Sequence, residues 1–279
     1  MSTLPLSSGV GLKAQHYQYL LENPNSVGWL EVHPENYMGA GGAPHQYLTS
    51  LRENYPLSMH GVGMSLGSSE GIHSKHLQNL KALVDRYQPE QVSEHLSWSH
   101  WNSHYLNDLL PLPYTKESLQ TICNNIDKVQ NILGRHILIE NPSTYIDFTQ
   151  NDYSETDMFR EIIKKTGCGI LLDINNVYVC ANNHEFSAQE YLDAFPIEAV
   201  EEVHLAGHTR QTLTNGKEIC IDDHGSAVTE AVWTLYEYFI SNTQRAFPTL
   251  IEWDTDVPNV ETLLSQAALA EKKAIGALS

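Results

Sequence analysis

Short apolar runs recur eight times along the chain, with acids, histidines and asparagines at their ends. Each run is long enough for one buried strand, and the stretches between runs carry apolar residues at helical spacing. The runs cover residues 9–12, 29–37, 55–60, 91–95, 136–141, 169–176, 200–208 and 248–254. Helices are predicted over residues 13–22, 73–86, 115–133, 155–165, 188–195, 227–240 and 259–270. The clearest is 115–133, with Thr115 and Ser118 suited to cap its start and Gly134 to end it.

Strands that alternate with helices predict repeated strand–helix units. The simplest closed arrangement of such units is an α/β fold in which eight parallel strands form a (β/α)8 TIM barrel. This fold typically needs about 250 residues, so the 279 residues suit a single domain over 1–279. Residues 38–44 and 98–113 are less regular and follow predicted strands, so both segments are candidate lids or recognition loops.

Charge and composition exclude several classes of protein. The formal net charge of -18 disfavours nucleic acid as a partner, because such binding depends largely on clustered Lys and Arg. The chain lacks an apolar run of about 18 residues and a secretory signal pattern, so we expect a cytoplasmic protein without membrane contact. Its cysteines are widely spaced, with no C-x-x-C pair, and we expect reduced thiols without a chemical role. They are Cys123, Cys168, Cys180 and Cys220.

Ionisable side chains end six of the predicted strands. They are His60, Glu94, Glu140, Asp173, His204 and Glu252. Unpaired charges at one barrel mouth would repel each other or lose their hydration at a high cost, and divalent cations would remove that conflict. Glu140 and Glu252 each follow Leu-Ile, so their carboxylates lie at the edge of the core, where a carboxylate can bridge two metals. Asp222 and His224 form an Asp-x-His triplet that can direct an oxygen and an imidazole nitrogen at one cation.

Mixed ligation by oxygen and imidazole suits iron, manganese or zinc rather than a closed zinc site made of thiolates. Iron chemistry would need open positions for oxygen and substrate, whereas a hydrolytic zinc cluster needs one activated water. The candidate ligands named above fit both iron chemistry and a hydrolytic zinc cluster. The residues therefore leave open an iron-dependent oxidase, a Zn or Mn hydrolase or isomerase, and a noncatalytic metal-binding scaffold.

Motifs along almost the whole chain resemble those of one known family. They are GVGL, WLEVHPENY, MHGVGMSLG, SEHLSW, LIENPSTY, LLDINNVYV, EVHLAGH, DDHG and LIEWD. In this order and spacing they resemble the multinuclear non-heme iron-dependent oxidative enzymes, which include the oxidase of methanobactin biosynthesis. The resemblance implies a barrel that holds two or three iron ions and uses dioxygen to modify cysteine, or another residue, of a ribosomally made precursor peptide. It also implies a partner protein that presents the peptide.

A more distant resemblance is to xylose isomerase-like barrels, especially the trinuclear zinc enzymes of the endonuclease IV type. It implies three groups of ligands. The first is His60, Glu94 and Glu140. The second is Asp173, His204 and Glu252, with Glu140 as a bridge. The third is Asn176, Asp222 and His224. Glu94 and Asn176 stand where the nuclease family has histidine, and the amide of Asn176 is expected to weaken the third group.

Other polar residues flank these ligands in the sequence. Because of their position beside the proposed ligands, His95, His208 and Asn141 are expected to orient the ligands or to contact the substrate. His33 and Glu35 are expected to act in the same way.

Overall fold

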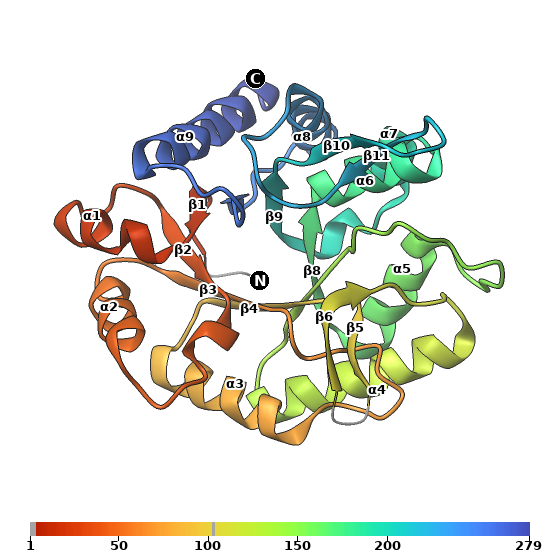
Figure 1. Cartoon of the computed structure of the whole chain (residues 1–279), viewed down its shortest axis with the longest axis horizontal. Helices are drawn as coiled ribbons and strands as arrows, with labels where there is room; N and C mark the ends of the chain where they lie inside the picture. The colour runs from red at the N-terminus through yellow and green to blue at the C-terminus, as the bar shows by residue number, and fades with distance from the viewer. Residues whose placement is uncertain (1–3, 102–103) are drawn as a thin grey trace.

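Eight parallel strands close into a barrel in the computed structural model, which describes residues 4–101 and 104–279 (Figure 1). Hydrogen-bonded neighbours follow the order β1-β12-β9-β8-β7-β4-β3-β2, which returns to β1. The strands are β1 (Ser8–Gly11), β2 (Trp29–Val32), β3 (Leu57–Gly61), β4 (Gln91–His95), β7 (Leu138–Glu140), β8 (Gly169–Asp173), β9 (Val200–Ala206) and β12 (Thr249–Glu252). Each lies within or overlaps one of the eight apolar runs, so the predicted TIM barrel is confirmed.

Helices surround the barrel and pack their apolar faces against it. The α-helices are α1 (Tyr17–Glu22), α2 (Ala43–Arg52), α3 (Ser74–Tyr87), α4 (Lys116–Leu133), α5 (Glu155–Thr166), α6 (Ile174–His184), α7 (Ala188–Ala194), α8 (Glu230–Thr243) and α9 (Val260–Ala277). Short 3-10 helices are η1 (Ala14–His16), η2 (Pro34–Tyr37) and η3 (Ile197–Ala199). The ends predicted for α4 are confirmed: the Thr115 side chain accepts a hydrogen bond from Ser118 N–H, and Gly134 ends the helix at a φ of 70°. Within the described residues, no helix has the length and apolar character needed to cross a membrane.

Two helices depart from the sequence prediction. The run 169–176 was expected to be one strand, but β8 ends at Asp173 and α6 begins at the next residue. The Asp173 carboxylate accepts a hydrogen bond from Asn176 N–H at 2.8 Å, which caps α6 and stops the strand. Helix α2 begins at Ala43, inside the glycine-rich segment 38–44, with a proline in its first turn. Asn176 therefore extends from a helix rather than from a strand.

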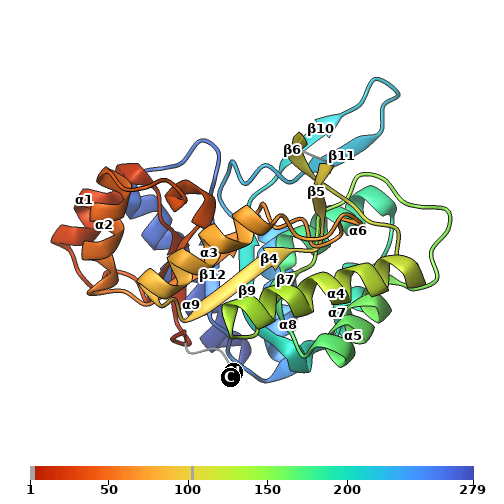
Figure 2. The same cartoon turned by 90° about the horizontal axis from the view of Figure 1, so that it is seen from below.

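Two antiparallel hairpins stand at the same end of the barrel (Figure 2). One joins β5 (Trp98–Trp101) to β6 (His104–Leu110), and the other joins β10 (Thr209–Thr212) to β11 (Glu218–Ile221). The segment 98–113 was expected to be irregular, so its strands correct that prediction, while residues 102 and 103 lie outside the described part. The second hairpin was not predicted, because every residue of β10 is exposed and the strand carries no apolar alternation.

Candidate metal centre

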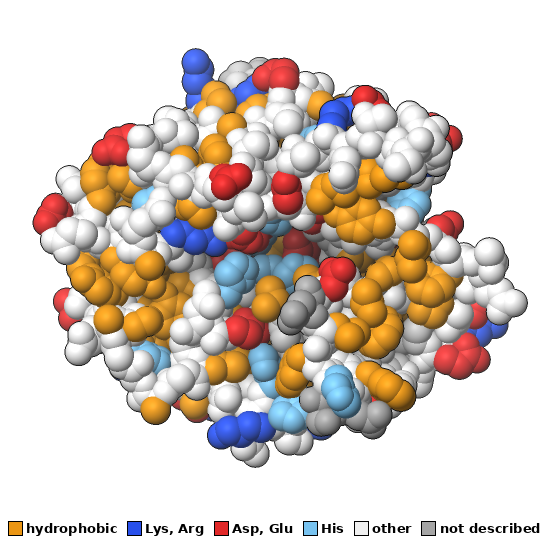
Figure 3. All heavy atoms as spheres, in the orientation of Figure 1, with side chains coloured by type: hydrophobic (Ala, Val, Ile, Leu, Met, Phe, Trp, Pro, Cys, Tyr) orange, Lys and Arg blue, Asp and Glu red, His pale blue; other side chains and the backbone are white. Residues whose placement is uncertain are grey.

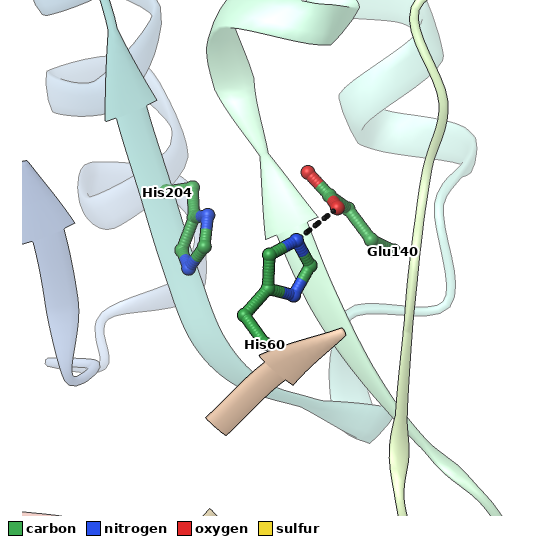
Figure 4. A group of neighbouring side chains, drawn as sticks. All are labelled: His60, Glu140 and His204. Atoms are coloured by element: carbon green, nitrogen blue, oxygen red, sulfur yellow. Dashed lines mark ion pairs between the residues drawn. The ribbon is translucent and has the colours of Figure 1, made fainter. Parts of the chain in front are cut away.

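Imidazole and carboxylate groups converge inside the C-terminal end of the barrel. Figure 4 shows His60 of β3, Glu140 of β7 and His204 of β9 gathered at one point. His60 Nε2 lies 3.0 Å from Glu140 Oε2, and one ligand atom from each of the three residues lies within 4.8 Å of the others. All three side chains are buried. Figure 3 shows histidine and acidic side chains within a central hollow of this face. This group could hold a metal ion.

His95 joins this group, whereas Glu94 has other partners. His95 Nε2 lies 2.9 Å from Glu140 Oε2 and 3.3 Å from His60 Nε2. The Glu94 carboxylate instead accepts hydrogen bonds from the backbone N–H groups of Met64 and His95, each at 3.1 Å. It packs so closely under Gly61 that a Cβ there would lie 2.5 Å from Glu94 Oε2. The structure thus brings the His95 side chain against Glu140, whereas the Glu94 carboxylate is held by backbone N–H groups.

A second group surrounds His224 in the loop that follows β11. Asp173, His224 and Glu252 each offer a ligand atom within 4.8 Å of the others. His224 Nε2 lies 2.7 Å from Asp222 Oδ1, so the two ends of the Asp-x-His triplet come together. The backbone of His224 has a φ of 45°, in the left-handed region that histidine adopts more readily than most residues. Asp254 N–H holds this turn by donating to the His224 carbonyl at 2.9 Å.

His204 connects the groups through Glu252, which was predicted, and through Glu31 and Glu202, which were not among the predicted ligands. Its Nδ1 lies 3.1 Å from Glu252 Oε2, and its Nε2 lies 3.4 Å from Glu31 Oε2 and 3.5 Å from Glu202 Oε1. Glu31, Glu202 and His204 form a further buried group of ligand atoms within 4.8 Å. The period of two along a strand was the available signal, because Glu202 lies two residues before His204 and shares its face.

The same signal applies to Asp254, which lies two residues after Glu252. His33, Glu252 and Asp254 form a more exposed group, with His33 Nε2 at 3.7 Å from Asp254 Oδ2. His33 Nδ1 also lies 3.2 Å from the His60 carbonyl oxygen. The expectation that His33 lies beside the ligands agrees with these contacts.

Asparagines fix the positions of two candidate ligands. Asn176 Nδ2 donates to Glu140 Oε1 at 3.3 Å and to the Asn141 carbonyl at 3.0 Å. Asn141 in turn pairs with the backbone of Asp173, accepting from its N–H at 2.8 Å and donating to its carbonyl at 2.9 Å. Asn141 therefore ties the end of β7 to the end of β8, which holds Glu140 and Asp173 side by side.

His208 reaches the candidate ligand Asp222 only through another side chain, that of Asn175. Its Nδ1 contacts Asn175 Oδ1 at 2.8 Å, and Asn175 Nδ2 donates to Asp222 Oδ1 at 2.7 Å. Glu35 Oε1 accepts backbone hydrogen bonds from Val62 and Gly63, just after His60 in the chain, at 3.2 and 3.0 Å. In this arrangement His208 orients Asp222 through Asn175, and Glu35 holds the loop after β3.

Burial and neighbouring charges shift the protonation of the cluster. Burial opposes ionisation of Glu140, but the charges of His95 and His60 outweigh it and hold the pKa of Glu140 below its ordinary value. Burial likewise opposes protonation of His95, yet Glu140 raises the pKa of His95 well above 6.5. Burial, with the charges of Glu140 and Asp222, raises the pKa of Asp173 well above its ordinary value. Without a cation the cluster therefore retains protons, and a cation would displace them.

Buried polar atoms without hydrogen-bond partners mark the same place. They include Asp173 Oδ2 and Asn176 Oδ1, while five further atoms have only the ion-pair contacts given above: Glu31 Oε2, Glu140 Oε2, Glu202 Oε1, His204 Nε2 and His224 Nε2. Leaving one such atom unpaired typically costs about 1–3 kcal/mol, so a cluster of them calls for a bound group. Oxygen and imidazole nitrogen are the ligands that divalent transition metals take without thiolates. The residues present thus fit a group of metal ions.

The cysteines take no part in this cluster. All four are buried and free, as expected, and none belongs to a candidate metal group among the described residues. Burial raises the pKa of Cys168 and of Cys180 to about 12, so both remain neutral thiols at physiological pH.

Solved structures share the fold. Endonuclease IV from Thermus thermophilus is 13% identical with a TM-score of 0.60, covering 97% of this chain and 99% of its own. A xylose isomerase-like TIM barrel protein from Mycobacterium smegmatis, solved with magnesium, is 11% identical with a TM-score of 0.61, covering 99% of this chain and 98% of its own. At these identities the likeness concerns the fold alone, and it confirms the predicted xylose isomerase-like architecture.

Closer relatives extend over nearly the whole chain. The UPF0276 protein of Rhizobium meliloti is 48% identical over 265 residues, which cover 95% of this chain and 85% of the relative. That of Psychromonas ingrahamii is 46% identical over 258 residues, covering 92% of this chain and 90% of the relative. A family model described as RiPP precursor modification enzyme MbnB/TglH/ChrH matches residues 7–274. RiPPs are ribosomally synthesised peptides that are modified after translation. The chain therefore belongs to the MbnB/TglH/ChrH family of enzymes that modify RiPP precursors.

Proposed function

We propose that this protein is a multinuclear non-heme iron oxidase that uses dioxygen to modify a cysteine of a precursor peptide. The observation that carries the proposal is the cluster of buried, unsatisfied imidazole and carboxylate atoms at the mouth of a barrel from a precursor-modifying family. Dioxygen is the oxidant: hydrogen and electrons leave the cysteine, and oxygen is reduced to water. When metal ions are bound, they would transfer electrons from the cysteine to dioxygen.

Three groups of residues would hold the metal. The first is His60, His95 and Glu140, with His95 replacing Glu94 because of its contact with Glu140. The second is Asp173, His204 and Glu252, with Glu140 shared between the two. The third is Asp222 and His224, with Asn176 as a neutral donor. Asn176 already donates to Glu140, so only its carbonyl oxygen, which has no hydrogen-bond partner, is free to act as a ligand.

The residues of the chain would position the substrate and control protons. In the first group the His60 and Glu140 side chains are 1% exposed, whereas the His95 side chain is 15% exposed. The peptide would therefore reach this group on the side of His95. Asp173 would release its proton when a cation binds, since the raised pKa of Asp173 reflects burial and neighbouring carboxylates. Burial of the remaining ligands would exclude water from the reaction.

A precursor peptide is the substrate that the family implies, and we propose that a partner protein presents it. The formal net charge of -18 favours peptides with basic segments.

Metal analysis and an oxygen assay test the proposal. The protein would be produced in iron-supplemented cells and characterised by elemental analysis and Mössbauer spectroscopy. Cysteine peptides and matched serine peptides would then be incubated with and without oxygen and analysed by mass spectrometry. More than one iron per chain, and an oxygen-dependent mass change confined to cysteine peptides, would support the proposal.

Two other outcomes would refute it. Stoichiometric zinc or manganese that iron does not displace, with activity unaffected by oxygen, would indicate a hydrolase or isomerase. Fully coordinated metal with no turnover of any peptide would indicate a noncatalytic scaffold.

A further inference from the structure

A cavity of about 440 Å³ lies between α5, α6, α7 and the loop that follows β7. Aromatic side chains form part of its wall and include Phe148, Phe186 and Tyr191. Phe186 is 39% exposed, and its ring lies against that of Tyr191 with the two centroids 5.8 Å apart. Figure 3 shows hydrophobic side chains gathered to the right of the central hollow, on the side where Figure 1 places α5, α6 and α7.

Three carboxylates line the cavity, of which Asp147 and Glu190 are exposed and Glu155 is half-buried. Tyr114 Oη donates to Glu155 Oε2 at 2.6 Å, and Tyr191 Oη donates to Oε1 at 2.5 Å. No lysine or arginine occurs among the described residues that line the cavity. His184 lines it too, but its Nε2 lies 2.8 Å from Thr144 Oγ1. The Glu155 carboxylate is therefore held by two phenols, and His184 is the only basic side chain among the described residues that line the cavity.

Glu155 is half-buried and no lysine or arginine lines its cavity among the described residues, and the loss of hydration is visible in its pKa. Burial raises the pKa of Glu155 above its ordinary value, by more than the hydrogen bonds from Tyr114 and Tyr191 lower it. A cation that entered the cavity would offset the lost hydration of Glu155, and the aromatic walls would cover an aliphatic stem and stabilise the charge.

The cavity lies next to the proposed metal centre. Cys180, in its wall, is one helical turn after Asn176 on α6, a separation of about 6 Å along the axis. Thr144 N–H donates to Cys180 Sγ at 3.2 Å, which joins the loop after Glu140 to this wall. Because an extended peptide rises about 3.3 Å per residue, a residue roughly two to five positions from the reacting one would reach the cavity.

We propose that this cavity binds a lysine side chain of the precursor peptide, with its ammonium group against Glu155. This inference rests on the proposed function, because it assumes a peptide at the metal centre. Lysine fits better than arginine, since each oxygen of Glu155 already accepts one phenol O–H, which disfavours a planar two-point contact but leaves room for a point charge. The cavity would thus select precursors by a residue near the modified one.

Binding of two small amides tests the cavity without any oxidation. N-acetyl-lysine methylamide and N-acetyl-norleucine methylamide differ in the charged amine, and calorimetry with ligand-observed NMR would give their affinities. A hydrogen bond to a charged group is worth about 1.5–3 kcal/mol, so we expect about ten- to hundredfold tighter binding of the lysine amide. Glu155→Gln should abolish this preference. Glu117→Gln, an exposed acid in the first turn of α4, should preserve it.

A second variant guards against loss of folding in the first. Ala194→Leu adds volume to the cavity wall without touching the charge, and it should weaken binding of the lysine amide. Thermal unfolding would confirm that each variant is folded. Equal binding of both amides to the wild type, binding of neither at tens of millimolar, or a preference that survives Glu155→Gln would overturn the inference.

The two proposals can fail separately. Selective lysine binding in a protein that does not oxidise cysteine peptides would leave the cavity assigned and refute the oxidase. Oxidation of cysteine peptides whose KM is unchanged by a nearby lysine, at any spacing, would refute the cavity and leave the oxidase.

Discussion

Replacing Glu140 by glutamine tests the centre most directly, because one carboxylate faces two imidazoles and an asparagine. Its Oε2 lies 3.0 Å from His60 Nε2 and 2.9 Å from His95 Nε2, and its Oε1 accepts from Asn176 at 3.3 Å. Glutamine keeps the shape and removes the charge. We expect Glu140→Gln to lose more metal than His224→Asn, since Glu140 would serve two metal positions and His224 one. Asparagine is chosen for His224 because it tolerates the left-handed backbone.

The effect on the metal-free protein follows from the buried ion pairs. Removing one partner of such a pair costs about 3–5 kcal/mol. At about 2–4 °C per kcal/mol for a chain of this size, the melting temperature should fall by at least about 6 °C. The lowered pKa of Glu140 adds stability above its ordinary 4.5, and the raised pKa of His95 adds stability that is complete below 6.5 and lost above it. The difference in melting temperature between Glu140→Gln and the wild type should therefore be largest between pH 4.5 and 6.5.

Elemental analysis and calorimetry of metal-free and metal-loaded samples would measure both effects. Glu201→Gln is the matched control, because Glu201 also pairs with a histidine, His136 at 3.3 Å, but is partly exposed. Such pairs are worth about 1 kcal/mol or less. Equal metal loss in Glu140→Gln and His224→Asn would refute the shared position. Equal melting temperatures for Glu140→Gln and the wild type between pH 4.5 and 6.5 would refute the ion-pair argument.

Three further predictions concern other parts of the molecule. Burial raises the pKa of Glu202 from 4.5 to about 7, so ionisation destabilises the folded protein as the pH rises through 7. Glu202→Gln should stabilise the metal-free protein by about 2–3 kcal/mol at pH 8 but not at pH 4, as urea unfolding would show; a gain at both pH values would contradict this reasoning. Metal binding must displace the proton of His95, so titration by calorimetry should show proton release and an affinity that rises between pH 6 and 8; a pH-independent affinity would count against His95 as a ligand. Phe159 is fully buried, and Phe159→Ala should cost about 3–5 kcal/mol in chemical denaturation, with metal content unchanged once the protein is folded; loss below 1 kcal/mol would mean that the core is looser than the structure indicates.

The barrel was predictable because its strands are buried on both faces. Such strands read as continuous apolar runs, and β3 and β8 are buried at every residue. The start of α6 was not predicted from the same signal, because Asp173 and the two asparagines after Ile174 were interpreted as the polar end of a strand. The stop comes from the hydrogen bond of the Asp173 carboxylate to Asn176 N–H, which depends on local geometry.

The location of the candidate metal centre was predictable from the sequence, but the set of residues that form it was less so. Residues at the ends of strands were found because the barrel fold gathers them at one mouth. Glu31 and Glu202 were missed because they lie inside the strands, where attention to the strand ends overlooks the period of two. The contact of Glu140 with His95 rather than with Glu94 was not predicted. Adjacent residues on a strand point to opposite faces, and the register of β4 decides which of the two lies against Glu140.

The two hairpins have a consequence for how such a protein can diversify. The barrel closes without β5, β6, β10 or β11, so neither hairpin contributes to the register of the strands that carry the buried acids and histidines. Changes in the length of a surface connection cost little free energy, because loop-closure entropy grows slowly with length. Descendants of one ancestral gene can therefore lengthen, shorten or exchange these hairpins while the centre beneath them is inherited intact. Substrate range and metal chemistry are in this way open to separate selection.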